Sequence, residues 1–324
     1  MIIDRVDVEF GRSERLRVPP VKDAYPRLSL DLVDVAVGPD GTVLGTWTDA
    51  VERRELERTL SGGASSSSAT GFHVEVVAQY AQTGEIVAQW EIWTTAVMQE
   101  YRAFEDGCLL GFSRLSAAGD HVSIFDAVGA ELQSSRFSRG FTDVAVIDNG
   151  ILAVSFDRYF RDELGTVLGL AMYTRALERT EFGDGAGYQP SALTVSGSAL
   201  HFWDRNSGLI MSSARGKPIW PDQSQRLIGP IEPHWVLHSP RTNRWALVAK
   251  SSGGSLDVVL GIVDEDQWTT AGELMIREPA SLPHQATVVT CDGTTIHCCV
   301  GRQWHSLSLD DLFDEWEMGE QAGP

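Results

Sequence analysis

The chain has few basic residues for its size and no long apolar run. Its 324 residues include 26 Lys and Arg against 45 Asp and Glu, which gives a formal net charge of −19. A chain this acidic repels a phosphate backbone, so we expect no nucleic-acid partner. A membrane helix needs about 18 or more consecutive apolar residues, and the sequence contains no such run, so we expect no membrane partner.

Cysteine is also scarce. The four cysteines are Cys108, Cys291, Cys298 and Cys299, and no two of them form a Cys-x-x-Cys pair. So few cysteines in a long chain predict neither a disulfide framework nor a structural zinc site. The N-terminal segment lacks the basic, apolar and small-residue succession of a secretory signal. We therefore expect a cytoplasmic protein with reduced thiols.

Familiar catalytic signatures are missing as well. The sequence has no phosphate-binding Gly-x-x-x-x-Gly-Lys loop, no His-Glu-x-x-His and no Gly-x-Ser-x-Gly. These motifs identify nucleotide hydrolases, zinc proteases and serine hydrolases. Any enzymatic activity must therefore use a different constellation of residues.

A repeat of strand, tight turn and strand is present instead. Asp34–Val37 recurs unchanged as Asp143–Val146, and each copy is followed by a turn glycine, Gly41 or Gly150. Alternating apolar residues around such a turn predict a β-hairpin. Weaker copies recur at intervals of about forty to fifty residues, a period typical of four-stranded blades.

Six such units can be counted, and the chain resembles the six-bladed β-propellers, with seven blades as the alternative. The resemblance covers nearly the whole chain, and no motif assigns the chain to one family of propellers. It implies an all-β fold in a single domain of residues 1–324, closed by the N-terminal strand and followed by a short C-terminal helix. The expected blades are residues 30–93 (with a flexible serine-rich loop at 61–71), 98–137, 141–182, 189–220, 234–276, and 284–309 completed by the strand 2–10.

Two helices are expected outside the blades. Residues 49–60 predict a short helix with Asp49 as its N-cap. At the C-terminus, Ser308 and Asp311 resemble a capping box, and apolar residues recur at helical spacing over residues 309–318. We expect this last helix to cover an apolar patch, or, less favoured, to dock a partner.

In a propeller, the residue that begins each innermost strand faces one mouth of the central channel. By repeat position, these residues are three carboxylates and, in a slightly shifted register, two imidazoles and two amides. They are Asp34, Glu100, Asp143, His234, His284, Gln189 and Gln285.

Two interpretations of these residues remain open. In the first, Asp34, Glu100 and Asp143 hold a divalent metal such as Ca or Mg or provide a catalytic base, with His234 or His284 as acid/base. In the second, they only cap strand ends and bind water. No cofactor is required by either.

Two aromatic residues are further candidates for ligand binding. Tyr159 lies in the charged insertion 157–163, which either overhangs a pocket or is a solvated loop. Trp235 either lines a binding surface or wedges between blades.

The sequence favours a binding protein, monomeric or weakly oligomeric, that holds a small molecule or a protein partner at the polar channel mouth. The alternative is a propeller enzyme, a hydrolase, lyase or cyclase, that uses the same residues. A second alternative is an interaction scaffold that works through the blade rim or the C-terminal helix. Fold alone does not choose among these functions.

Overall fold

The fold was analysed in a computed structural model of the chain. The structure describes residues 6–10, 13–20, 30–38, 41–61, 73–94, 98, 100–113, 120–137, 141–147, 151–156, 169–180, 190–196, 199–212, 217–221, 232–251, 254–265, 267–277 and 287–322. The expected serine-rich loop lies almost entirely outside these residues.

The first sheet carries one of the two helices. Its strand order is β3-β4-β5-β6, all antiparallel neighbours. The helix α1 joins β4 to β5, and Asp49 accepts the N–H groups of Val51 and Glu52, so the predicted N-cap is confirmed. The elements are β3 (Asp31–Val37), β4 (Val43–Thr48), α1 (Ala50–Ser61), β5 (His73–Tyr80) and β6 (Ile86–Thr94).

The second and third sheets repeat this pattern without a helix. Their orders are β10-β9-β8-β7 and β11-β12-β13-β14. Gly107, in the turn of the second sheet, has φ of 83°, and the predicted turn glycine Gly41 of the first sheet has φ of 69°, a region in which glycine is strain-free. The strands are β7 (Glu100–Ala103), β8 (Leu109–Ser113), β9 (Asp120–Phe125), β10 (Glu131–Phe137), β11 (Phe141–Ile147), β12 (Ile151–Phe156), β13 (Leu170–Tyr173) and β14 (Arg179–Thr180).

The fourth and fifth blades are joined at their outer strands. Trp220 and Pro221 of β18 pair in parallel with Gln267 and Trp268 of β22, which links the two blades into one sheet. The strands are β15 (Pro190–Ser196), β16 (Ala199–Asp204), β17 (Leu209–Ser212), β18 (Lys217–Pro221), β19 (Trp235–Ser239), β20 (Arg244–Ser251), β21 (Ser255–Asp264) and β22 (Gln267–Arg277).

The sixth sheet takes its fourth strand from the N-terminal segment, but not from the residues expected. Its order is β2-β25-β24-β23, with β2 at Ser13–Arg15. The expected strand at 2–10 appears as β1 (Val6–Glu9), which pairs in parallel with β22 of the fifth blade. The remaining strands of the sixth sheet are β23 (Thr287–Cys291), β24 (Thr295–Val300) and β25 (Gln303–Ser308).

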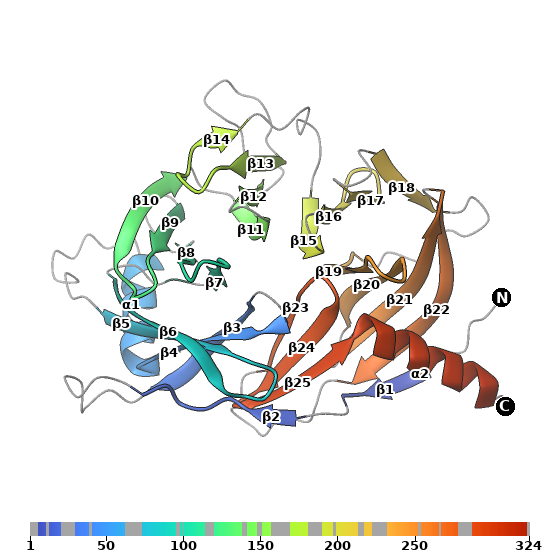
Figure 1. Cartoon of the computed structure of the whole chain (residues 1–324), viewed down its shortest axis with the longest axis horizontal. Helices are drawn as coiled ribbons and strands as arrows, with labels where there is room; N and C mark the ends of the chain where they lie inside the picture. Colours follow the sequence, from blue (N-terminus) through green and yellow to red (C-terminus); the bar gives the residue numbers. More distant parts are fainter. Residues whose placement is uncertain are drawn as a thin grey trace. The chain divides into compact units, whose positions relative to one another are not determined.

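The C-terminal helix α2 (Leu309–Ala322) is confirmed and begins with the predicted capping box. Ser308 Oγ and Asp311 Oδ2 lie 2.7 Å apart, and each accepts the other residue's backbone N–H. The helix contacts β19, β20, β22 and β1 (Figure 1). Its apolar side therefore packs against the fifth blade.

Six blades of this kind, following one another along the chain, form a six-bladed β-propeller, as the repeat predicted, and the fourth and fifth blades are joined into one sheet. The chain divides into two compact units, which are described separately. One contains Glu14–Phe141 and Gly301–Trp304, and the other Met1–Ser13, Thr142–Val300 and His305–Pro324. No helix in the described part of the chain is both long and apolar enough to span a membrane.

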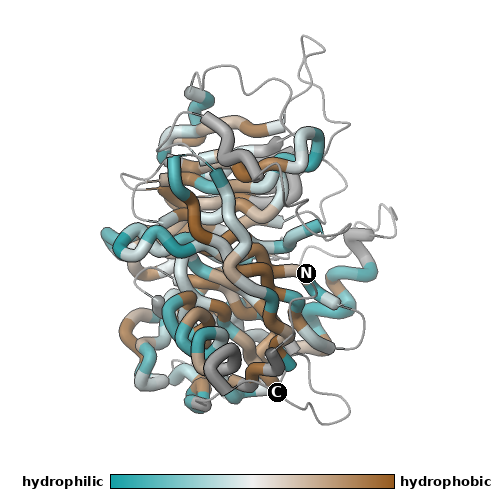
Figure 2. Tube along the Cα trace, turned by 90° about the vertical axis from the view of Figure 1, so that its right-hand side faces the viewer, coloured by the Kyte–Doolittle hydropathy of each residue, from teal (hydrophilic) through white to brown (hydrophobic). Residues whose placement is uncertain are grey.

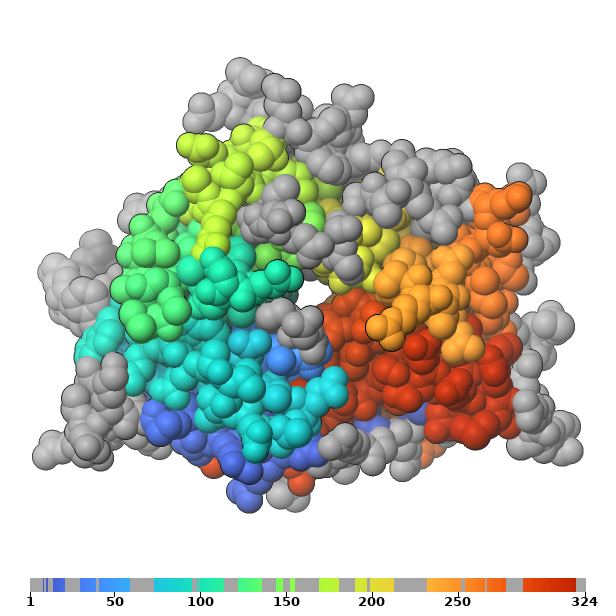
Figure 3. Space-filling model, in the orientation of Figure 1, coloured from blue at the N-terminus to red at the C-terminus, as the bar shows by residue number. Residues whose placement is uncertain are grey.

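Hydrophobic and hydrophilic stretches alternate along the chain (Figure 2). In the first unit, one apolar cluster joins the first two sheets, and its members include Trp90, Tyr101 and Phe125. Gly111 is required there, because a Cβ at this position would lie 2.8 Å from Tyr101 Cε1. The atoms of these two sheets, coloured blue to green, lie against one another in Figure 3. None of the four cysteines, all of which the structure describes, is joined to another by a disulfide.

Candidate functional site

Two of the three predicted carboxylates lie on neighbouring inner strands of one unit. Asp34 belongs to β3 and Glu100 begins β7, and these two strands are in contact. A β-bulge separates Leu32 from Asp34, so the pairing of β3 with β4 shifts just before the acid. Bulges of this kind re-aim side chains and are common beside functional sites.

The environment of Asp34 is unfavourable for a negative charge. The side chain is partly buried, and burial, followed by the nearby Glu100, raises the pKa of Asp34 from 3.8 to about 7. Three groups lower the pKa of Asp34, but their combined effect is smaller than the effect of burial and Glu100. They are the Val35 N–H, Arg53 and Arg102. At neutral pH the carboxyl group is therefore poised between donating and accepting a proton.

Glu100 is held by a basic neighbour on the same strand. It forms an ion pair with Arg102, and both side chains are partly buried. Residues i and i+2 point to the same side of a strand. The pair therefore presents a fixed carboxylate next to Asp34.

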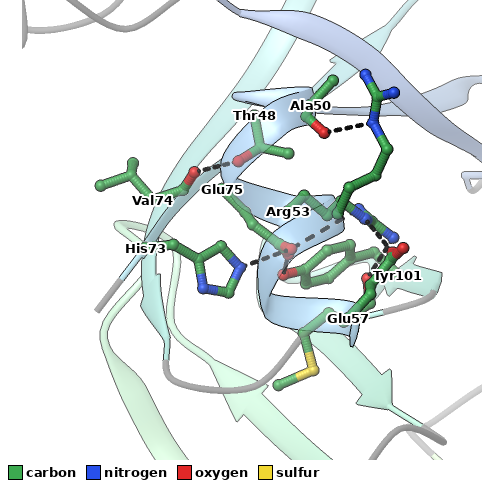
Figure 4. Close-up of polar contacts among 10 residues, drawn as sticks. Thr48, Ala50, Arg53, Glu57, His73, Val74, Glu75 and Tyr101 are labelled. Atoms are coloured by element: carbon green, nitrogen blue, oxygen red, sulfur yellow. Dashed lines mark hydrogen bonds and ion pairs between the residues drawn. The ribbon is translucent and has the colours of Figure 1, made fainter. Parts of the chain in front are cut away.

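A second cluster of polar groups is buried in the same unit (Figure 4). Glu75 of β5 is completely buried, and its Oε2 accepts a hydrogen bond of 2.5 Å from the hydroxyl of Tyr101. Its Oε1 lies 3.1 Å from His73 Nε2 and 3.7 Å from Arg53 Nη1. Burial, followed by Glu75, raises the pKa of Tyr101 well above 10.0, so this hydroxyl keeps its proton.

The sequence analysis missed this cluster, although one signal was available. His73 and Glu75 are two residues apart in a predicted strand and thus share a face. The rest of this strand is mostly apolar, so the strand is expected to be buried. A glutamate in such a strand is unusual, because a buried charge needs a partner. The partners Arg53 and Tyr101 come from α1 and β7, and no local pattern identifies them.

The other predicted site residues are not brought together by the part of the chain that the structure describes. Asp143 is in β11, in the second unit, and its side chain lies outside that part. His234 is exposed, and its Nδ1 accepts the Lys250 N–H at 3.3 Å. Partial burial and then Lys250 lower the pKa of His234. His284, Gln285, Gln189 and Tyr159 lie outside the described residues.

Trp235 is half-buried at the start of β19, in the second unit. Lys250 Nζ lies 5.4 Å from the centre of its ring, and the ring also packs against the core of the fifth and sixth blades. This arrangement is consistent with the wedging role considered above. Its ligand-binding role stays a prediction.

The described residues do not by themselves form a metal site. No group of three or more His, Cys, Asp or Glu among them is arranged to hold an ion. Glu100 is also already paired with Arg102. Because the expected metal site includes the Asp143 side chain, which lies outside the described residues, the expected Ca or Mg site stays a prediction.

Comparison with known proteins gives no family. No protein-family model matches the chain, and no curated protein matches it in sequence.

Among solved structures, the chain is similar to a candidate 6-phosphogluconolactonase from Bacteroides uniformis, with 12% identity over 82% of this chain and 76% of that chain and a TM-score of 0.43. It is also similar to a candidate oxidoreductase (glucose dehydrogenase) from Thermus thermophilus, with 11% identity, 86% and 100% coverage and a TM-score of 0.45. A third is TolB from Acinetobacter baumannii, with 11% identity, 87% and 78% coverage and a TM-score of 0.37. At these values none of the three carries an argument about what this chain does.

Proposed function

We propose that this protein binds a small, positively charged ligand, with the carboxyl groups of Asp34 and Glu100 as its acceptors. The observation that carries the proposal is the placement of Asp34 and Glu100 on the contacting inner strands β3 and β7, where burial and then Glu100 raise the pKa of Asp34 to about 7. Arg102 partly balances the charge of Glu100, so Asp34 is the principal acceptor and Glu100 adds the oxygen lone pairs that its ion pair leaves open. An ammonium group has the charge and the hydrogen-bond donors that these oxygens accept.

The charge of the whole chain supports the same class of ligand. A net charge of −19 raises the local concentration of small cations around the molecule and speeds their association. A protein partner that presents a lysine side chain would use the same two acceptors. A small molecule fits this place better than a protein partner, because Asp34 is partly buried and a single ammonium group balances the charge of its carboxylate.

The experiment measures binding of amine probes by calorimetry at pH 6, 7 and 8. We expect ethanolamine or putrescine to bind and the neutral probe glycerol to bind much more weakly. A cation binds the ionised form of Asp34, and the fraction of that form grows as the pH increases. Below pH 7, the affinity should therefore increase by up to about tenfold for each unit by which the pH is raised. Asp34→Asn should weaken binding and remove this pH dependence.

Asp31→Asn is the matched control, since Asp31 is an exposed acid on the same strand. It should bind the probes as the unchanged protein does. The proposal is wrong if no amine binds better than glycerol, or if Asp34→Asn and Asp31→Asn have the same affinity.

A second candidate function is catalysis by a hydrolase, lyase or cyclase in which Asp34 is the general acid or base. It is favoured by the same pKa of about 7, since proton transfer is most effective when the pKa of the group lies near the working pH. Any activity found should then have a pH profile with an inflection near 7. An inflection that persists in Asp34→Asn would exclude this role.

A further inference from the structure

The strand that carries Glu100 has little backbone support of its own. β7 is four residues long and lies at one end of its sheet, and among the described strands it pairs with β8 alone. Segments with few backbone hydrogen bonds are the ones that open locally in a folded protein. The position of Glu100 therefore depends on further contacts.

Two hydrogen bonds to the first blade are made on either side of Glu100 in the sequence. Arg53 of α1 donates from Nη2 to the carbonyl oxygen of Met98 at 3.1 Å, and the Tyr101 hydroxyl donates to Oε2 of Glu75 at 2.5 Å (Figure 4). Met98 precedes Glu100 by two residues, and Tyr101 follows it directly. Glu100 therefore lies between two points that are bonded to the neighbouring blade.

Both bonds meet at one buried carboxylate. Glu75 is completely buried, and its Oε1 lies 3.1 Å from His73 Nε2 and 3.7 Å from Arg53 Nη1. Arg53 is 8% exposed, and its Nε donates to Glu57 Oε1 at 3.1 Å. A buried network whose members have several partners favours a single arrangement. The two bonds described above are therefore fixed in place together.

The bond between Tyr101 and Glu75 also specifies which way the side chains of β7 point. Residues of this strand are alternately partly buried and buried, and Tyr101 is on the buried side. Successive side chains point to opposite faces of a strand, so Glu100 points to the other side. A slip of one residue would exchange the two faces and separate the Tyr101 hydroxyl from Glu75. Because a buried charge needs its partners, the bond opposes such a slip.

We propose that Tyr101 is a positioning residue, whose hydrogen bond to Glu75 holds β7 so that Glu100 stays at the contact with β3, the strand of Asp34. The part that concerns ligand binding rests on the proposed function above, in which Glu100 is the second acceptor. The part that concerns the strand does not, because these bonds are present without any ligand.

The first test measures native-state hydrogen exchange at the backbone amides of β7 by NMR, with the full chain. Tyr101→Phe removes the hydroxyl group and keeps the ring. Exchange in β7 should become about tenfold faster or more, because a hydrogen bond to a charged group has this effect on an opening equilibrium.

Tyr80→Phe is the matched control. Tyr80 lies on β5, is also almost completely buried and donates its hydroxyl to the carbonyl oxygen of Arg17 at 2.6 Å. This variant should lower the free energy of unfolding in urea without changing exchange in β7, because local opening of β7 does not break the Tyr80 bond. Equal exchange in β7 in the two variants would overturn the proposal.

A second variant applies if circular dichroism shows that Tyr101→Phe does not fold. In Glu75→Gln the Tyr101 hydroxyl bonds to a neutral acceptor, and such a bond is roughly half as strong. Exchange in β7 should then still become faster than in Tyr80→Phe. Unchanged exchange in a folded Glu75→Gln would overturn the proposal.

Ethanolamine binding, measured by calorimetry, tests the link to Glu100. Tyr101→Phe should weaken binding by the same factor as Glu100→Gln does. In a chain that already carries Glu100→Gln, it should weaken binding no further, because the two residues then act through one carboxylate. No effect of Tyr101→Phe, or an equal effect with and without Glu100→Gln, would overturn the proposal.

The same measurements separate this proposal from the proposed function. If ethanolamine and putrescine do not bind the unchanged protein but exchange in β7 is faster in Tyr101→Phe than in Tyr80→Phe, the proposed function fails and the positioning of β7 by Tyr101 stands. If the amines bind and exchange in β7 is equal in the two variants, the proposed function stands and Tyr101 has no positioning role.

Discussion

At the scale of single residues, Asp34 makes the stability of the folded protein depend on pH. Its pKa is 3.8 in an unfolded chain and about 7 in the folded one. Between these values the folded state retains a proton that the unfolded state releases. The free energy of unfolding therefore falls as the pH rises from about 4 to 7, and the contribution of Asp34 is constant above that range.

Asp34→Asn should remove this decrease in the free energy of unfolding, because asparagine does not ionise. At pH 8 we expect the variant to be more stable than the unchanged protein, with about 4 kcal/mol as an upper bound from the size of the shift. At pH 4 the two proteins should be nearly equal. Urea unfolding at both pH values measures the difference, and equal stabilities at pH 8 would contradict the expectation.

The placement of two acids could be predicted from the repeat, whereas the residues that surround Glu75 could not. The repeat alone placed Asp34 and Glu100 at equivalent positions of adjacent inner strands, and the structure brings them together. Arg53 and Tyr101 meet Glu75 only through tertiary packing. No local spacing in the sequence predicts these contacts, because Arg53, Glu75 and Tyr101 come from a helix and from strands of two different sheets.

At the scale of elements, α2 shows how an amphipathic helix is attached to a blade. Leu309, Leu312 and Phe313 are at most 1% exposed, so one side of the helix is completely covered. Arg244 of β20 stacks on Phe313, with its guanidinium carbon 4.6 Å from the ring centre, and donates to Glu317 at 3.2 Å. The apolar contacts dominate, since exposed ion pairs add little.

Leu312→Ala should destabilise the protein by about 2–5 kcal/mol, because it leaves a cavity in a fully buried position. Met318→Ala is the matched control on the same helix, since Met318 is 57% exposed and should change stability by less than about 0.5 kcal/mol. Thermal unfolding of both variants provides the comparison. Equal effects of the two substitutions would show that α2 is not attached through this side.

The helices could be predicted from their ends, whereas the N-terminal strand could not be assigned to its sheet. Capping residues act within three or four positions, so Asp49 and Ser308 are informative on their own. A strand pairs through backbone groups, which every residue carries. The alternation of Val6 and Val8 therefore predicts a strand but not whether it joins the fifth or the sixth blade.

At the scale of the whole molecule, the blade period was enough to predict six blades, because the hairpins of each blade are built by contacts between residues near in sequence. The strands β1 and β2, which come from the N-terminal segment, are the exceptions. Backbone pairing between blades depends on single outer strands, and the blade period does not predict which strands pair in this way. The parallel pairing of Trp220–Pro221 with Gln267–Trp268 is such a link.

This link has a consequence for how the protein opens. Neighbouring blades ordinarily share only side-chain contacts, whereas the fourth and fifth blades also share backbone hydrogen bonds. The amide protons of β17 and β21 should therefore become accessible to deuterium in one cooperative event. Native-state exchange followed by mass spectrometry should give the same opening free energy for both strands, and a higher value than for β13. Separate openings of β17 and β21 would mean that the bridge breaks first and that the two blades are energetically independent.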